Sequence, residues 1–281
     1  MSTERPKVLV LGSFDDLRSP DVRFLQEAAR LGAVEVLLFS DRAADFSADR
    51  APAFPVEERR YLVQAIRYVS AVRVIDEFRD PASIVAQCAH GAKAWAVREA
   101  HASPTARSFC ESAGIEYVVI RDDELVGFPG PTPVKATVAT AGGTARKKAI
   151  VTGCYDWLHS GHVRFFEEVS ELAELYVTVG SDRNIEHLKG EGHPLFPEDE
   201  RRYVVGSIRY VKQALVASGW GWLDAEPDIE IIRPDIYAVN EDGDRPEKRE
   251  FCEARGIEYR VLRRLPRPGL PARQSTDFRG F

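Results

Sequence analysis

Short apolar runs alternate with amphipathic segments along most of this chain. In the second half they predict strands at about residues 148–153, 175–180, 213–217, 236–240 and 258–262, and helices at about 161–173, 198–209 and 246–255. The strands are nearly continuous apolar runs, which is typical of parallel strands covered on both faces. The pattern predicts a doubly wound α/β sheet, because right-handed crossovers place helices on both faces of such a sheet.

The pattern occurs twice, so the chain contains an internal repeat. Three pairs of segments align in the same order: GSFDDLRSPDVRFL (12–25) with GCYDWLHSGHVRFF (153–166), EERRYLVQAIRYV (57–69) with DERRYVVGSIRYV (199–211), and FCESAGIEYVVI (109–120) with FCEARGIEYRVL (251–262). Repeats of this length are duplicated domains rather than solenoid units.

We therefore expect two tandem Rossmann-like domains, one at 1–128 and one at 148–281. The segment between them, 129–147, is rich in Pro, Gly, Thr and Ala and has little apolar periodicity. This composition is typical of a linker.

Composition excludes several classes of protein. The formal net charge of −6 argues against broad nucleic-acid binding, which requires a basic face. No apolar run approaches the roughly 20 residues that cross a bilayer, so we expect no membrane span. The N-terminal apolar stretch reads as a first strand without a cleavage site, and we expect a cytoplasmic protein. The four cysteines have no CxxC spacing and are expected to be reduced thiols rather than zinc ligands.

The segment 153–166 carries the clearest chemical signal. It places His159 and His162, separated by Gly161, directly after a predicted strand and at the start of a predicted helix. The exposed N–H groups and the dipole of a helix N-terminus favour a polyphosphate there. Ligands of doubly wound sheets also bind at the carboxyl ends of the strands.

GCYDWLHSGH resembles the GxFDxxHxGH signature of the cytidylyltransferase-like nucleotidyltransferases, with Tyr155 in place of Phe. Later segments resemble further family motifs: RNIEHLKG with Lys189, PEDERRYVV with Asp199 and Arg201, AVNED at 238–242, and RPGLPARQSTDF at 267–278 as a variant of the C-terminal loop. The resemblance covers 147–281 with its motifs and 7–122 as a scaffold only.

The family joins a nucleoside triphosphate to a phosphate- or phosphonate-bearing acceptor and releases pyrophosphate. The attacking group is already an anion, so catalysis consists of positioning and charge stabilisation. The resemblance implies catalytic roles for His159, His162, Lys189 and Arg201, and nucleotide contacts from Gly153, Cys154, Tyr155, Gly161, Asn240, Asp242, Ser275 and Thr276. It also implies Mg²⁺ that bridges phosphate oxygens and is held largely by the nucleotide and water.

Several assignments have structural alternatives. Arg201 has a counterpart in Arg59 of the first copy, which favours a structural ion pair as much as phosphate binding. Asp156 is matched by Asp15, so a turn-capping carboxylate is as plausible as a metal ligand. In the C-terminal loop, either Arg267 or Arg273 takes the place of the family's arginine.

The first copy lacks the chemistry. Arg18 and Asp21 replace the two histidines, Pro20 replaces the glycine, and Ala48 stands where Lys189 would align. An Asp facing a polyphosphate would repel it, and Pro20 removes an N–H donor. We expect a non-catalytic first domain that serves as a built-in dimer partner, a layout similar to that of the ethanolamine-phosphate cytidylyltransferases. A homodimer of the whole chain stays open.

Three functions compete. CMP transfer from CTP to a small phosphorylated or phosphonate acceptor is favoured. An adenylyltransferase of the sugar-phosphate type, using ATP, is the alternative, since SDRNIEHLKGEGHP resembles that branch at least as well. A non-catalytic nucleotide-binding scaffold is the third. The sequence does not identify the acceptor, for which Trp157, Trp220 and Trp222 are candidate contacts.

Overall fold

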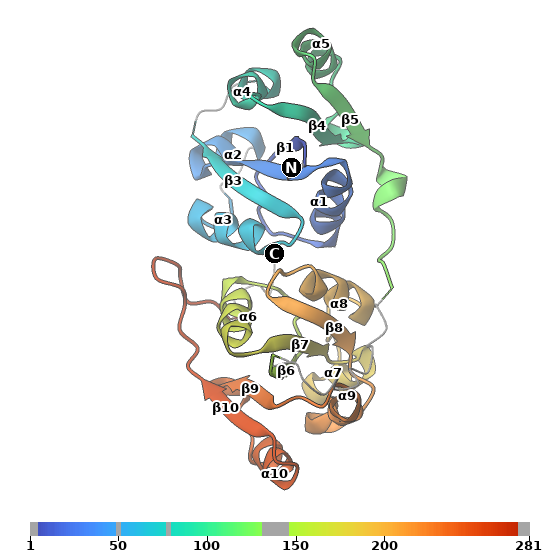
Figure 1. Cartoon of the computed structure of the whole chain (residues 1–281), viewed down its shortest axis with the longest axis vertical. Coiled ribbons are helices and arrows are strands. Elements are labelled where there is room, and N and C mark those ends of the chain that lie inside the picture. Colours follow the sequence, from blue (N-terminus) through green and yellow to red (C-terminus); the bar gives the residue numbers. More distant parts are fainter. Residues whose placement is uncertain (1–4, 49–51, 77–79, 131–145, 275–281) are drawn as a thin grey trace. The chain divides into compact units, whose positions relative to one another are not determined.

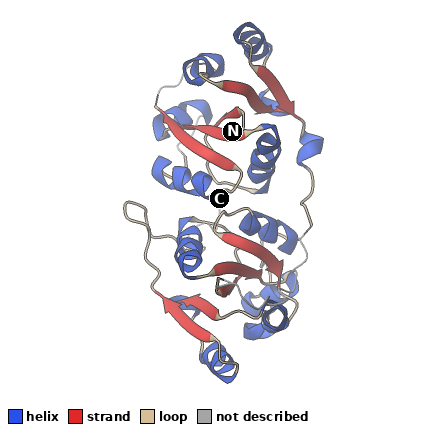
Figure 2. Cartoon of the chain, viewed as in Figure 1, coloured by secondary structure: helices blue, strands red, loops and turns tan. Residues whose placement is uncertain are grey.

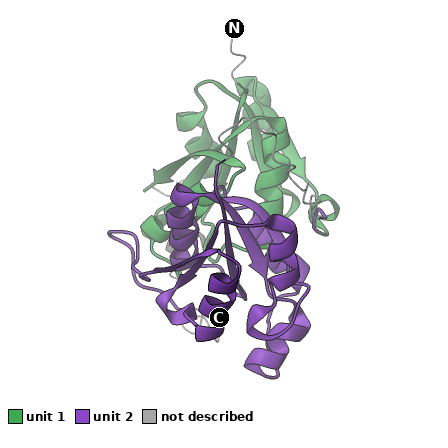
Figure 3. Cartoon of the chain, turned by 60° about the horizontal axis from the view of Figure 1, so that its bottom comes forward, with its two compact units in different colours: residues 1–127 green, residues 128–281 purple. Residues whose placement is uncertain are grey.

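The chain divides into two compact units, Met1–Gly127 and Phe128–Phe281 (Figure 3). The computed structural model describes residues 5–48, 52–76, 80–130 and 146–274. Most of the expected linker, Ser275 and Thr276 lie outside these residues. Each unit contains one five-stranded parallel sheet with helices between its strands (Figures 1 and 2). The predicted α/β fold class is thus confirmed.

The first unit has the strand order β3-β2-β1-β4-β5. Its strands are β1 (Lys7–Gly12), β2 (Ala33–Phe39), β3 (Val69–Ile75), β4 (Ala92–Arg98) and β5 (Glu116–Ile120). Its helices are α1 (Ser19–Leu31), α2 (Asp41–Ala48), α3 (Val56–Ala65), α4 (Pro81–Cys88) and α5 (Pro104–Ala113), with short 3-10 turns η1 (Glu99–His101) and η2 (Asp122–Leu125).

The second unit repeats this order as β10-β9-β6-β7-β8. Its strands are β6 (Lys148–Gly153), β7 (Glu174–Val179), β8 (Val211–Val216), β9 (Ile236–Asn240) and β10 (Glu258–Leu262). Its helices are α6 (Ser160–Leu172), α7 (Asp182–Lys189), α8 (Glu198–Gly206), α9 (Glu226–Ile232) and α10 (Pro246–Ala254), with 3-10 turns η3 (Gly221–Leu223) and η4 (Glu241–Gly243).

The apolar pattern did not predict α7 or α9, and it predicted that α8 extends to residue 209 instead of Gly206. Both missed helices are short, and α7 (DRNIEHLK) is strongly polar, so neither carries the long apolar period that identifies a helix. Lys189 is the last residue of α7. The helix α8 ends at Gly206, because Ser207 and Ile208 turn the chain back toward β8.

Helices cover both faces of the second sheet. Ile150 and Tyr176 pack with Ile229 of α9 and Phe251 of α10 in one buried cluster. The helices α6 and α8 contact β6, β7 and β8. They connect strands in the opposite direction across the sheet, so right-handed crossovers place them on the other face. The central strand β6 therefore ends between the two helical layers.

Candidate active site

The turn between β6 and α6 brings the two histidines together. His159 is the N-cap of α6, and its Nδ1 accepts a hydrogen bond from the Gly161 N–H at 3.1 Å. A ring nitrogen that accepts carries no proton, so the proton of neutral His159 lies on Nε2. The His159 and His162 rings stack, with centroids 3.9 Å apart and an interplanar angle of 26°.

His162 is held neutral by its surroundings. Burial lowers its pKa well below the ordinary value, and His159, Arg264 and Lys189 act in the same direction. Its Nδ1 is buried and has no hydrogen-bond partner among the described residues. A hydrogen bond from the ring to the Trp157 backbone acts against this lowering. That bond uses the single N–H of the neutral ring, so Nδ1 can donate to a phosphate oxygen only when the ring is protonated. The negative charge of a polyphosphate would stabilise that protonated form.

Two glycines make room for the aromatic rings. Tyr155 adopts a left-handed backbone conformation, with φ of 53°, and its ring lies edge-on to His162 at 5.3 Å between centroids. A Cβ at Gly153 would lie 2.7 Å from the Tyr155 ring, and one at Gly161 would lie 2.9 Å from the His159 ring. The spacing of glycines and rings in the motif therefore has a packing reason.

Asp156 fastens the motif loop to the segment before α8. Its carboxylate accepts hydrogen bonds from the Leu195 and Phe196 N–H groups at 2.8 and 3.0 Å. In the first unit Asp15 accepts from the Ala53 and Phe54 N–H groups at 2.8 and 2.9 Å. The same bonds occur in both units, so they favour a structural role over a metal ligand. They join residues that are 39 and 40 positions apart, so Asp156 ties two segments together and does not cap its own turn.

Arg201 lies beneath the site, 2% exposed. Its guanidinium donates to four acceptors, at 2.6–2.9 Å: the carbonyl oxygens of Phe196, Cys154 and Gly180, and the carboxylate of Asp182. Arg59 donates to the corresponding acceptors in the first unit, the carbonyls of Phe54, Ser13 and Phe39 and the carboxylate of Asp41, at 2.7–2.9 Å.

The shared network favours the structural role for Arg201. The donors of Arg201 bond protein acceptors in the unit that has the histidines. The donors of Arg59 bond the matching acceptors in the unit that lacks them. The catalytic role that the resemblance implies is not what this geometry supports. Arg201 instead holds the ends of β6 and β7 in register with α8.

A pocket of about 380 Å³ opens in front of the histidines. Its lining includes all of the nucleotide contacts that the resemblance implies and the structure describes: Gly153, Cys154, Tyr155, Gly161, Asn240 and Asp242. His162 and Lys189 also line it, whereas His159 packs behind His162. The ammonium of Lys189 is exposed and forms no ion pair with any described residue, so it is available to a phosphate.

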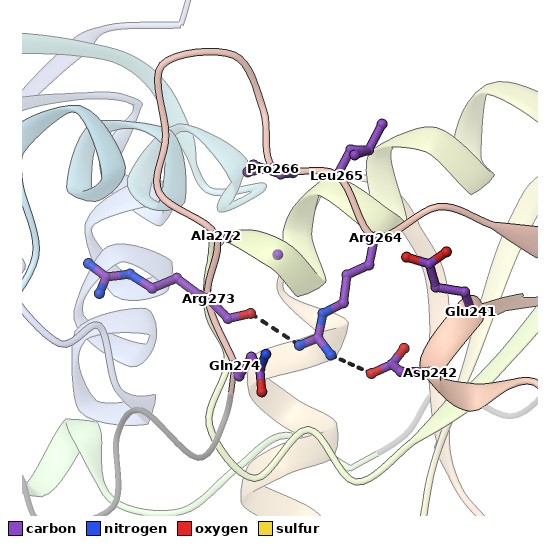
Figure 4. Close-up of a pocket in the computed structure, with 9 residues that line it drawn as sticks. Glu241, Asp242, Arg264, Leu265, Pro266, Ala272, Arg273 and Gln274 are labelled. Carbon is purple, nitrogen blue, oxygen red and sulfur yellow. Dashed lines mark hydrogen bonds and ion pairs between the residues drawn. The ribbon is translucent and has the colours of Figure 1, made fainter.

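Arg264 is the arginine that the C-terminal segment brings to this pocket. It was not among the arginines predicted for this role, Arg267 and Arg273. Its guanidinium pairs with Asp242 and donates to the carbonyl oxygen of Arg273 at 3.2 Å (Figure 4). Arg267 instead bonds Glu167 of α6 at 3.4 Å. The place of Arg264 directly after β10 was a usable signal, because the carboxyl ends of parallel strands share one edge of the sheet.

A second pocket, of about 370 Å³, extends the first toward the C-terminal segment and shares Gly161, Asp242, Arg264 and Gln274 with it. Figure 4 shows its opposite walls, with Glu241 and Arg264 on one side and Ala272 and Gln274 on the other. The two pockets together can hold a ligand with a polyanionic part and a polar extension.

Comparisons with known proteins identify the family of the second unit. The family described as "Cytidylyltransferase-like" matches residues 150–264. An FAD synthase from Ferroglobus placidus is 37% identical over 120 residues, which cover 42% of this chain and 75% of the relative. The bifunctional protein HldE from Photobacterium profundum is 36% identical over 87 residues, 31% of this chain and 18% of the relative.

Among solved structures, a lipopolysaccharide core biosynthesis protein from Thermoplasma volcanium is 23% identical, with a TM-score of 0.37, and the match covers 44% of this chain and 99% of that one. The motif, the matched family and the coverage of the first relative define the class: a nucleotidyltransferase. The chain belongs to the cytidylyltransferase-like nucleotidyltransferase family. No helix in the described residues is long and apolar enough to span a membrane.

Proposed function

We propose that the second unit transfers a nucleoside monophosphate from a nucleoside triphosphate to a phosphate-bearing acceptor and releases pyrophosphate. The stacked pair of His159 and His162 at the start of α6, facing a pocket that also holds Lys189, is the observation that carries the proposal. Family membership supports the reaction class.

Each residue has a role that follows from its geometry. His162 becomes protonated when the negative charge of the nucleotide raises its pKa, and its Nδ1 then donates to a phosphate oxygen and stabilises the charge that moves to the leaving pyrophosphate. His159 orients His162 by stacking on it. The Lys189 ammonium adds a compact positive charge at the phosphates. Asn240 and Asp242 line the same pocket, and we assign them to the nucleoside on the family resemblance.

The similarity to FAD synthases favours ATP as the donor, because FAD contains an adenylyl group. We therefore propose adenylyl transfer, the alternative of the sequence analysis, ahead of CMP transfer. CTP stays the second candidate because the matched family is described as cytidylyltransferase-like.

Mg²⁺ is proposed as the metal that accompanies the nucleotide. In the part of the chain that the structure describes, no group of three His, Cys, Asp or Glu side chains is arranged to hold a metal ion. Asp156 accepts backbone N–H groups and Asp242 pairs with Arg264, so both nearby carboxylates are engaged. The ion would be held by phosphate oxygens and water, where it neutralises phosphate charge.

We propose that the first unit does not catalyse. Arg18, Pro20 and Asp21 stand at the positions of His159, Gly161 and His162. The hydrogen bonds of Arg59 and Asp15 match those of Arg201 and Asp156 in the second unit. They support a first unit that keeps the fold and serves as a built-in dimer partner. Whether whole chains also pair is a question of oligomeric state that light scattering would answer.

A pyrophosphate-release assay tests the function. Purified chain would be given ATP or CTP, Mg²⁺ and a panel of phosphorylated and phosphonate acceptors, FMN and sugar phosphates included. We expect turnover with one nucleotide and at least a 100-fold lower rate in His162→Ala. Arg18→Ala, at the matching motif of the first unit, is the control and should keep the wild-type rate.

Two outcomes would contradict the proposal. Nucleotide binding without pyrophosphate release for any acceptor would favour the scaffold alternative. Unchanged turnover in folded His162→Ala would remove the histidines from the chemistry.

A further inference from the structure

A buried lysine lines the same pocket as His162, and the function proposed above does not use it. Lys248 of α10 is 7% exposed, yet it lines the same pocket as His162 and Lys189. Its Nζ donates to the Thr152 hydroxyl at 3.3 Å and lies 5.6 Å from the centre of the Tyr237 ring. The Thr152 and Tyr237 hydroxyls bond each other at 3.0 Å.

The charge of Lys248 is only partly compensated inside the protein. Of its three N–H donors, one has an acceptor among the described residues, and no described carboxylate forms an ion pair with it. Asp224, the acid that acts on it electrostatically, is itself buried and bonded to the Asn184 amide at 3.1 Å. Burial lowers the pKa of Lys248, because a buried ammonium with one acceptor is costly. An anion in the pocket would supply the missing partner and stabilise the charged form.

The first unit has no such cluster at the matching positions. Thr152, Tyr237 and Lys248 align with Leu11, Trp95 and Ala106, each at the same place in its strand or helix. These three residues pack in or against the buried apolar core of that unit. The fold therefore does not require the lysine, and only the unit with the histidines has it.

Lys248 also reaches the pocket from the opposite side of the sheet to the histidines. Thr152 shares a face of β6 with Ile150, since side chains alternate along a strand. That face is covered by α9 and α10, whereas the histidines begin α6 on the other face. In phosphoryl transfer the attacking and leaving oxygens lie roughly in line on opposite sides of the phosphorus.

We propose that Lys248, held by Thr152, binds the phosphate group of the acceptor and aims it at the α-phosphorus. This inference rests on the proposed function. An oxygen of the acceptor phosphate forms the new bond to the α-phosphorus. The bond from that phosphorus to the bridging oxygen breaks, and its electron pair leaves with pyrophosphate. The attacking oxygen is already an anion, so no proton is removed in the step.

Steady-state kinetics of Lys248→Met test the assignment. With the acceptor that supports turnover, we expect the KM for that acceptor to rise at least tenfold and the KM for the nucleotide to stay within twofold. Thr152→Val, which removes the hydrogen bond that orients the ammonium, should raise the acceptor KM about threefold. Lys212→Met is the matched control, because Lys212 of β8 is exposed and Glu174 is its one ion-pair partner among the residues that the structure describes.

A binding measurement separates this proposal from the proposed function. Inorganic phosphate would be titrated by calorimetry into chain saturated with a non-hydrolysable ATP or CTP analogue, whichever binds. Wild type and Lys212→Met should bind phosphate, and Lys248→Met should bind it at least tenfold more weakly with the analogue affinity unchanged. If that holds while no acceptor gives pyrophosphate, the anion site stands and the transferase function fails.

Three results would overturn the inference. Wild-type chain could fail to bind phosphate. Folded Lys248→Met and Thr152→Val could both keep the wild-type KM for acceptor, which would make the lysine structural. Lys248→Met could raise only the nucleotide KM, which would place Lys248 with Lys189 at the triphosphate. Thermal unfolding tests whether each variant is folded. If Lys248→Met does not fold, the acceptor KM of Thr152→Val decides whether Lys248 binds phosphate or is structural.

Discussion

Arg98 donates to the carboxylate of Asp21 over 2.7 Å, and these two positions are Asn240 and His162 in the second unit. The Asp21 carboxylate also accepts the Arg18 N–H at 2.9 Å. Burial raises the pKa of Asp21, although Arg98 and the bond from Arg18 act against that rise. An internal ion pair therefore stands where the other unit lines its pocket with an imidazole and an amide.

The ion pair predicts one nucleotide site per chain. Calorimetry with a non-hydrolysable ATP or CTP analogue should give a stoichiometry of one, and His159→Ala with His162→Ala should abolish that binding. Replacing the pair by Asp21→His with Arg98→Asn should not create a second site, because Pro20 still lacks an N–H donor and Ala48 replaces the lysine. A stoichiometry of two in wild type would refute the prediction that the first unit binds no nucleotide.

Arg201 and Arg59 form a matched pair for a stability experiment. Arg201→Met and Arg59→Met each leave several buried carbonyl oxygens without a donor, so each should lower the free energy of unfolding of its own unit by about 3 kcal/mol. Urea denaturation measures the loss. Only Arg201→Met should also reduce pyrophosphate release, because Arg201 holds the Cys154 carbonyl in the motif loop. Unchanged stability with lost activity would instead support a direct phosphate contact.

The depressed pKa of His162 sets a pH dependence. The unfolded chain takes up a proton at this residue near pH 6.5, whereas the folded chain resists it to lower pH. The contribution of His162 to stability is therefore full above pH 6.5 and is lost as the pH falls toward the folded pKa. NMR titration should show a neutral His162 at pH 7 in the free chain and a raised pKa with bound nucleotide. A pKa at or above 6.5 without nucleotide would contradict the burial argument.

Asp228 predicts the opposite trend. Burial raises its pKa to about 6, and its Oδ2 has no hydrogen-bond partner among the described residues. The folded state therefore gains stability as the pH falls through 6 and is penalised above it. Asp228→Asn should stabilise the second unit by about 1 kcal/mol at pH 8, and this gain should disappear near pH 4. Urea denaturation at both pH values measures it, with the exposed Asp199→Asn as the control.

Much of the fold could be predicted because its signals are local or repeated. The ends of β6, β9 and β10 agree with the predicted strands, since apolar runs bounded by polar residues define buried parallel strands. The internal repeat then extended the assignment to the first unit. The short helices α7 and α9 could not be predicted, because seven or eight residues hold too little periodicity and their stability comes from packing.

The sequence by itself determined the family motif, the loss of both histidines from the first copy, and the class of reaction to expect. Only the tertiary structure decided what each matched side chain faces. Arg201 and Asp156 resemble site residues in sequence but bond the backbone, whereas Arg264 and Lys248 belong to no recognised motif and line the pocket. The reason is physical: a charged side chain acts on whatever lies within a few ångströms, and strand order, not spacing along the chain, brings β6, β9 and α10 together.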